Sequence, residues 1–178
     1  MGDLTKSYNE TCMCQTSFSL LIAILTLSRR IVVGKATEDK PASYWANSLD
    51  HDPPTQDMYL HLRPVINANG RKWMLEFVEA QGLRKMLESG IKAHFDFKDD
   101  NASLSCMQCL EGFMNNKAGL QFVLEDPQAI QDIAMFFHVP SIEVKSIVLK
   151  LLTVLAWMSD ATGPDGYVLH IWVEYLQT

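Results

Sequence analysis

The sequence predicts an all-α protein, and three observations lead to this fold class. Two nearly identical stretches lie 45 residues apart, Leu-Glu-Phe-Val at 75–78 and Leu-Gln-Phe-Val at 120–123. Apolar residues recur at spacings of three and four, which is the period of a helix with one buried face. No segment shows the alternation typical of a strand. Because a helical repeat of about 40–47 residues is typical of armadillo and HEAT solenoids, we expect an armadillo-like, right-handed α-solenoid that stops after about two to three repeats.

Residues 1–40 are expected to form an atypical leader. Their stretch 18–27 is apolar, but it is too short to span a bilayer. Charged residues on both sides of it, and the lack of a small-residue cleavage site, argue against a signal peptide. The leader is therefore either a helix packed on the solenoid or a segment that is not native to the mature protein. Residues 41–178 form the predicted domain, which we expect to be incomplete at its C-terminus and prone to aggregation.

The first elements of the domain are short. Residues 37–55 are polar and contain three prolines, so they predict a linker with one helix at 43–49. A helix follows at 58–66, where Pro64 either kinks it or marks a helix start. Asparagines and a glycine at 67–70 are expected to end that helix in a left-handed cap.

A three-helix unit is predicted at 71–116. Its first two helices are expected to stop near Gly82 and at Gly90, and charged residues at 92–102 predict a loop before the third. The third helix ends in asparagines at 115–116 and has a broad apolar stripe. The main members of that stripe are Leu104, Met107, Leu110 and Met114.

A second unit is predicted at 119–158. Asp126 and Pro127 supply an N-cap and a first-turn proline for its middle helix. Ser141 opens its longest helix, and a further helix is expected from residue 167 onwards. The buried face of the longest helix is predicted at Val144, Ile147, Val148, Leu151, Leu152 and Leu155.

Composition and motifs argue against an enzyme and against a nucleic-acid-binding protein. The formal net charge is -6, whereas nucleic-acid-binding domains usually carry a basic face, and a basic partner suits this charge best. The five histidines are scattered, and no phosphate-binding loop or nucleophile motif is present. We expect no cofactor. We also expect no metal, because the spacing of the four cysteines matches zinc poorly, and Cys106 and Cys109 fit buried thiols better.

Two features fit a binding surface. Asparagines at the helix ends 67–69 and 115–116 are either simple caps or hydrogen-bonding groups along one edge of a solenoid. Val154, Trp157 and Met158 lie beside the predicted core stripe, so they either line a groove for a helix or are covered by the next helix of the chain.

Four motifs resemble the diaphanous-related formins, in their N-terminal GTPase-binding and inhibitory armadillo region of the formin homology 3 type. Residues 109–119 resemble the family's Cys-Leu-x-x-x-Met-Asn-Asn-x-x-Gly run. Residues 41–49 are similar to the Pro-x-x-Tyr-aromatic segment that leads into it, and 67–73 to its asparagine triplet and tryptophan. Residues 150–158 resemble its groove helix. The resemblance extends over about residues 41–176.

The resemblance implies a regulatory module of the cytoplasm and cytoskeleton. A Rho-family GTPase in its GTP form would bind through Asn67 and Asn69. It would displace a C-terminal autoregulatory segment of the formin, whose binding keeps the actin-assembling domain silent, so actin is an indirect partner and the coupling is reciprocal. The groove contacts implied for that segment are Asn115, Val154, Trp157 and Met158.

The chain departs from the family pattern at three of these places. Ala68 replaces the middle asparagine and removes one polar contact, Glu111 stands where relatives often carry a basic residue, and Trp157 is bulkier than the usual aliphatic residue. The alternative function is a generic armadillo-type peptide-binding scaffold, with the apolar leader as a membrane tether. The sequence leaves membrane contact open.

Overall fold

The structure is a computed structural model that describes residues 40–162, and the regular structure of these residues is entirely helical. All of them belong to one compact unit, Gly34–Thr178. The elements are α2 (Ala42–Ser48), α3 (Gln56–Ala68), α4 (Arg71–Glu79), α5 (Gly82–Phe95), α6 (Asp100–Met114), α7 (Lys117–Glu125), α8 (Pro127–Met135), the 3-10 helix η1 (Phe136–His138) and α9 (Ile142–Thr162).

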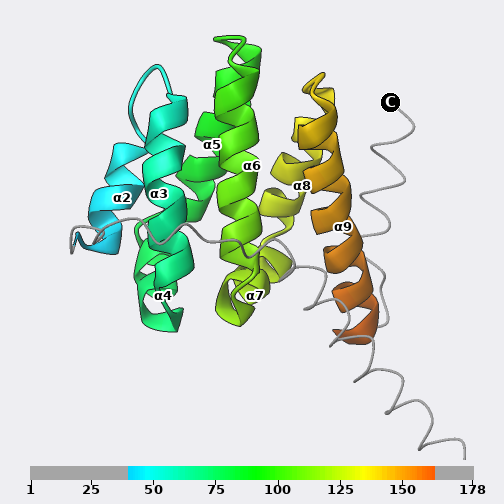
Figure 1. The fold of residues 1–178 in the computed structure, drawn as a ribbon. Helices are drawn as coiled ribbons and strands as arrows, with labels where there is room; N and C mark the ends of the chain where they lie inside the picture. The colour runs from blue at the N-terminus through cyan, green and yellow to red at the C-terminus, as the bar shows by residue number, and fades with distance from the viewer. Residues whose placement is uncertain (1–39, 163–178) are drawn as a thin grey trace, which may run out of the picture. The chain divides into compact units, whose positions relative to one another are not determined.

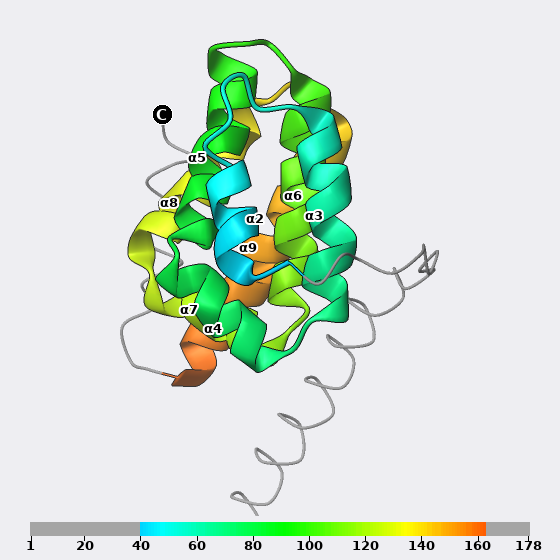
Figure 2. The same ribbon diagram turned by 90° about the vertical axis from the view of Figure 1, so that its left-hand side faces the viewer.

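The helices form two layers with short helices across one end. One layer contains α3, α6 and α9 side by side, and the other contains α2, α5 and α8 (Figure 1). Helices α4 and α7 lie across one end of both layers, as the view turned by 90° also shows (Figure 2). The order α4–α5–α6 is repeated as α7–α8–α9, which confirms the predicted all-α, armadillo-like solenoid and its two units. Helices α2 and α3 precede the first unit.

The 45-residue period of the sequence is visible in the packing of α3 on α6. Arg63 of α3 contacts Gln108 of α6, which lies 45 residues later in the chain.

The two similar stretches of the sequence, 75–78 and 120–123, fall in α4 and α7, but their buried residues differ. Phe77 is buried in α4 and Val123 in α7, whereas Phe122 is only partly buried. The second stretch is therefore shifted by one residue within its helix, so that Val123 of α7 takes the buried position that Phe77 has in α4.

A single apolar core joins the two layers. The residues predicted to face inward on α9, from Val144 to Leu155, are buried except for the partly buried Ile147. Helix α2 also belongs to this core, because Ala42, Ala46 and Leu49 are fully or almost fully buried. The short helix predicted at 43–49 is therefore confirmed as α2, although it packs in the core and is not part of a linker. Among the described helices, none combines the length and apolar character needed to cross a membrane.

The prediction that a helix stops at Gly90 is wrong. Helix α5 continues to Phe95, and only residues 96–99 connect it to α6, in place of the loop expected at 92–102. Gly90 lies in the helix because α6 packs directly on it: a β-carbon there would collide with Sγ of Cys106 and lie 2.9 Å from Cζ of Phe136. The glycine allows close helix packing, and it does not break the helix.

Most predicted helix starts are confirmed. The carboxylate of Asp126 accepts hydrogen bonds from the amides of Gln128 and Ala129 at the start of α8, and Ser141 Oγ accepts one from Val144 at the start of α9. The left-handed cap expected at 67–70 is not found, since Asn69 is extended, with φ −99° and ψ 151°. The helix predicted from residue 167 lies outside the described residues.

Candidate protein-binding surface

Asn67 lies in the last turn of α3, and its side chain covers Gly112 of α6. The atom Oδ1 of Asn67 is 2.6 Å from the point that a β-carbon at Gly112 would occupy. Asn67 is exposed, so its amide reaches solvent beside the joint between the two helices. An exposed amide has both donor and acceptor groups, and it can therefore bind another protein's main chain or polar side chains.

Asn69 has a structural role that is already visible. Its Nδ2 atom donates a hydrogen bond of 2.8 Å to the carbonyl oxygen of Val65, and its main-chain N–H donates to the same oxygen. The side chain thus closes the carbonyl end of α3, as a cap would. The side chain is half-buried, and its Oδ1 acceptor takes part in none of these bonds.

The two asparagines after α6 also differ from each other. Asn116 is the N-cap of α7, because its Oδ1 accepts a 2.9 Å hydrogen bond from the amide of Ala118. Asn115 is exposed at the end of α6. Asn67 and Asn115 therefore lie at the C-terminal ends of neighbouring, side-by-side helices (Figure 1).

The predicted groove residues of α9 are not equally accessible. Val154 is 5% exposed, although it lies outside the main core cluster. Trp157 and Met158 are half-buried. Val154 and Trp157 are three residues apart and share one side of the helix, and Val154 itself presents little surface to a partner. The structure brings Asn115 and Trp157 onto neighbouring helices, α6 and α9.

Two side-chain pairs join the helices of this layer, in addition to the bond from the Cys109 thiol to the Tyr59 carbonyl oxygen, and the sequence did not reveal either pair. Nη1 of Arg63 donates a 2.7 Å hydrogen bond to Oε1 of Gln108, which joins α3 to α6. Nζ of Lys150 donates to Oε1 of Glu111, which joins α9 to α6. The Glu111 side chain is only 11% exposed, so its charge depends on Lys150 for compensation. We call the side of α3, α6 and α9 that carries these four residues the three-helix face.

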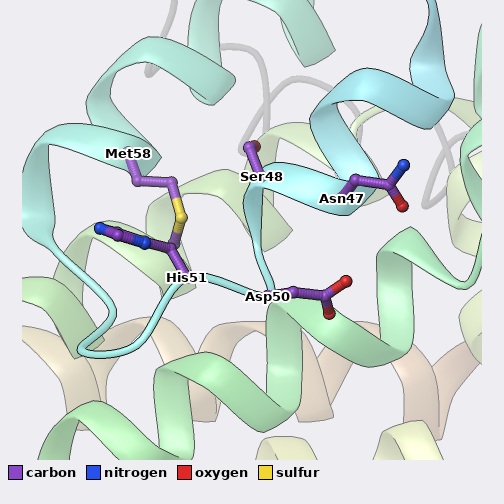
Figure 3. A pocket seen from close by; sticks show the side chains of 5 residues that line it. All are labelled: Asn47, Ser48, Asp50, His51 and Met58. Carbon is purple, nitrogen blue, oxygen red and sulfur yellow. The ribbon is translucent and has the colours of Figure 1, made fainter.

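A separate shallow depression lies where α2 ends and α3 begins (Figure 3). Its lining residues are Asn47, Ser48, Asp50, His51 and Met58. Lys85 of α5 binds Asp50 at 2.7 Å, and Ser48 Oγ donates to the carbonyl oxygen of Trp45. The Lys85–Asp50 pair fastens the α2–α3 loop to α5, whereas the Ser48 bond lies within α2. The depression is at the first turn of α3, whereas Asn67 is in its last turn.

The two cysteines among the described residues are buried in the core. The Cys106 thiol donates to the carbonyl oxygen of Met86, and the Cys109 thiol donates to that of Tyr59. Burial raises the pKa of Cys106 well above its usual value and that of Cys109 to about 12, so both thiols stay protonated near neutral pH. This confirms the prediction of buried thiols for these two cysteines. Within the described part of the chain, no three His, Cys, Asp or Glu side chains meet in a group that could hold a metal ion.

Comparison with known proteins shows the family of the chain. The family described as Diaphanous GTPase-binding Domain matches residues 34–157. Formin-D of Dictyostelium discoideum is 26% identical over 125 residues, which is 68% of this chain and 10% of the relative. Inverted formin-2 of Xenopus tropicalis is 25% identical over 145 residues, or 74% of this chain and 10% of the relative. Disheveled-associated activator of morphogenesis 2 of Gallus gallus is 24% identical over 116 residues, with 64% and 10% coverage.

The chain thus spans about a tenth of the length of these relatives. No solved structure matches it. The family match extends over more than half of the chain and includes the helices that carry Asn67, Asn69 and Asn115. The chain therefore belongs to the Diaphanous GTPase-binding Domain family, the GTPase-binding regulatory region of the diaphanous-related formins.

Proposed function

We propose that this chain binds a Rho-family GTPase in its GTP form and thereby regulates a formin that organises the actin cytoskeleton in the cytoplasm. The GTPase would contact Asn67 and Asn69 at the C-terminal end of α3. The observation that carries this proposal is the position of Asn67, whose exposed amide is held over Gly112 at the joint between α3 and α6. An amide placed in this way can pair with main-chain groups of a partner without a large loss of side-chain freedom.

A second ligand would occupy the three-helix face. We propose that the C-terminal autoregulatory segment of the same formin binds there as a helix, with Trp157 as its principal apolar contact. Asn115 and Met158 would contact the segment directly, and Val154 would support Trp157 from its buried position. The proposed GTPase contacts at the end of α3 and the three-helix face share α3 and α6, so we propose that the two ligands oppose each other. Each ligand would then weaken binding of the other by the same factor.

The GTPase proposal is tested by Asn67→Asp in the full chain. The matched control is Asn101→Asp, which makes the same change in the first turn of α6, at the opposite end of that helix from Asn115. We expect Asn67→Asp to weaken binding of a Rho-family GTPase loaded with a non-hydrolysable GTP analogue by about tenfold, since one lost hydrogen bond to a partner is worth about 1.4 kcal/mol. The control should leave binding unchanged. Equal binding of the GDP-loaded and GTP-analogue-loaded forms would refute the proposal.

The autoregulatory proposal is tested by Trp157→Glu. The control is Ile142→Glu at the other end of α9, where the side chain is 72% exposed. We expect Trp157→Glu to abolish capture of a synthetic peptide of a formin autoregulatory segment while helical circular dichroism stays the same. A loss of helicity in this variant would show that Trp157 belongs to the core, and the groove assignment would then be wrong.

A further inference from the structure

The first turns of α4 and α7 carry positive charge where helices usually carry negative charge. Helix α4 begins with Arg71 and Lys72, helix α7 begins with Lys117, and neither first turn contains an acid. The positive end of a helix dipole disfavours cations, so this placement is unfavourable within the molecule. Helices α3, α6 and α9 follow the usual rule, with Asp57, Asp100 and Glu143 in their first turns. Helix α5 also has cations in its first turn, but both are paired there, Arg84 with Glu88 at 3.1 Å and Lys85 with Asp50 at 2.7 Å.

The opposite ends of the two short helices break the same rule. Helix α4 ends with Glu79 and helix α7 ends with Glu125, although the negative end of the dipole disfavours acids. The charges of both helices thus oppose their dipoles in the same direction, in two successive units. Local rules that are broken in the same way at equivalent places point to function, because folding alone gains nothing from them.

The cations begin the two helices that follow the C-terminal ends of the side-by-side helices α3 and α6. Helices α4 and α7 lie at the same end of the layers, as both views show (Figure 1, Figure 2). Asn67, over Gly112, marks the place where the α3–α4 turn meets α6. We call Arg71, Lys72 and Lys117, together with Asn67 and Asn115, the cationic edge.

These cations are accessible and have little internal compensation. The Lys72 side chain is 93% exposed, and its ion pair with Glu76 has a distance of 3.9 Å on the surface, where such pairs contribute little. Arg71 and Lys117 are exposed, and within the described residues neither side chain forms an ion pair or a hydrogen bond. Neither of them binds the end of α3, where the Asn69 side chain donates to the carbonyl oxygen of Val65.

We propose that the cationic edge meets a patch of carboxylates on the GTPase that binds at Asn67, an inference that rests on the proposed function. The whole chain has a formal charge of -6, so an acidic partner would be repelled from most of its surface. A local positive edge would attract that partner and orient it toward Asn67. Charges at the rim of an interface act in this way mainly on the association rate.

An anionic membrane is the other surface that cations could meet, and the structure favours it less. Segments that bind anionic lipids usually have clusters of about four to eight basic residues. This edge has three, and asparagines precede them closely in the chain, Asn67 four residues before Arg71 and Asn115 two residues before Lys117. Amides that both donate and accept hydrogen bonds suit a protein surface.

The test is the double reversal Arg71→Glu/Lys72→Glu in the full chain, with Lys98→Glu/Lys145→Glu as the control. The control makes the same change in net charge in the α5–α6 turn and the first turn of α9, away from the edge. Association with a Rho-family GTPase loaded with a GTP analogue is measured at about 50 mM and about 500 mM salt, because charge effects are screened at the higher concentration. Thermal unfolding of each variant is recorded in parallel.

We expect the edge variant to associate about tenfold more slowly at low salt, with a difference that nearly disappears at high salt, while the control changes by less than about twofold. The edge variant should unfold at the same or a higher temperature, because glutamates at the start of α4 suit its dipole. Slower binding together with unchanged or greater stability cannot come from misfolding.

Three results would overturn the inference, and they can be told apart. If the unaltered chain binds no GTPase, the proposed function fails and this partner fails with it. If the unaltered chain binds and the edge variant associates equally fast, only the present inference fails. If the unaltered chain sediments with phosphatidylserine vesicles and the edge variant does not, the edge binds a membrane instead.

Discussion

The Oδ1 atom of Asn67 lies 2.6 Å from the place where a β-carbon on Gly112 would be, so these two residues, 45 positions apart in the chain, share one space. The contact joins the end of α3 to the last turn of α6. It also holds the amide that we propose for GTPase binding. A glycine in the interior of a helix disfavours that helix, and here it makes room for a side chain from the neighbouring helix α3.

Gly112→Ala should therefore weaken binding more than it weakens folding. The new methyl group would push the exposed Asn67 side chain aside, while the helix gains about 0.5–1 kcal/mol from alanine. We expect about tenfold weaker GTPase binding and a free energy of unfolding within about 1 kcal/mol of the original. Urea unfolding and binding titrations check this. The control is Gly70→Ala, where a β-carbon meets nothing within 4 Å and binding should persist.

Removal of Lys150 should destabilise the protein through Glu111. Lys150→Met leaves the carboxylate, whose side chain is 11% exposed, without its counter-charge. We expect a loss of about 2 kcal/mol, somewhat below the cost for a fully buried pair. The double variant Glu111→Gln/Lys150→Met should recover most of it, because no unpaired charge remains. A double-mutant cycle measures the coupling, and simple additivity of the two single changes would contradict the pair's importance.

Gly90→Ala should destabilise the contact between α5 and α6. The added methyl group would collide with Cys106 Sγ and lie 2.9 Å from Phe136 Cζ, which are both in the core. Overpacking of this kind costs about 1–3 kcal/mol. Cys106→Ala removes the sulfur, so the combined variant should be more stable than the sum of the single effects predicts. Thermal unfolding of the original protein, the two single variants and the double variant tests this. An unchanged stability of Gly90→Ala would show that the neighbouring side chains move to accommodate the methyl group.

Alkaline pH should weaken the fold through its two buried thiols. Burial raises the pKa of Cys109 to about 12 and that of Cys106 well above 9.0, the usual value for a thiol. The native state therefore holds protons that the unfolded state releases. This contribution to stability is complete below about pH 9 and is lost as the pH rises toward 12, by about 1.4 kcal/mol per pH unit and thiol. Denaturant unfolding across this range measures the slope.

The double variant Cys106→Ala/Cys109→Ala is the comparison for that slope. It should be less stable at neutral pH, because it leaves small cavities, but its stability should fall less steeply between about pH 9 and pH 10. Burial also raises the pKa of Tyr59, which adds to the loss above about pH 10 in both proteins. Equal slopes below that point would show that the thiols ionise without a cost to folding.

The sequence predicted the architecture because the helical period and the repeat are local patterns. The end of α5 was not predictable in this way. A glycine in a sequence suggests a helix end, and only the packing of Cys106 and Phe136 on Gly90 shows that this glycine allows a close approach. Val154 was missed for a related reason. Its spacing places it beside the main core stripe, yet its surroundings bury it to 5% exposure.

The candidate surface was predictable only in part. The sequence and its family resemblance indicated Asn67 and Asn69, but not that Asn69 closes α3 with its own side chain. Glu111 stood out as an unusual charge, whereas its compensation by Lys150 required the structure, because 39 residues separate the two. Long-range pairs of this kind leave no periodic signal in a single sequence.

The bonds Arg63–Gln108 and Lys150–Glu111 also have a mechanical consequence. One joins α3 to α6 and the other joins α6 to α9. If either neighbour slid along α6 by one helical turn, about 5.4 Å, its bond would break. The three helices are therefore locked at one axial offset. A polypeptide that crosses all three would meet side chains at a constant spacing, and it would have to match that spacing itself.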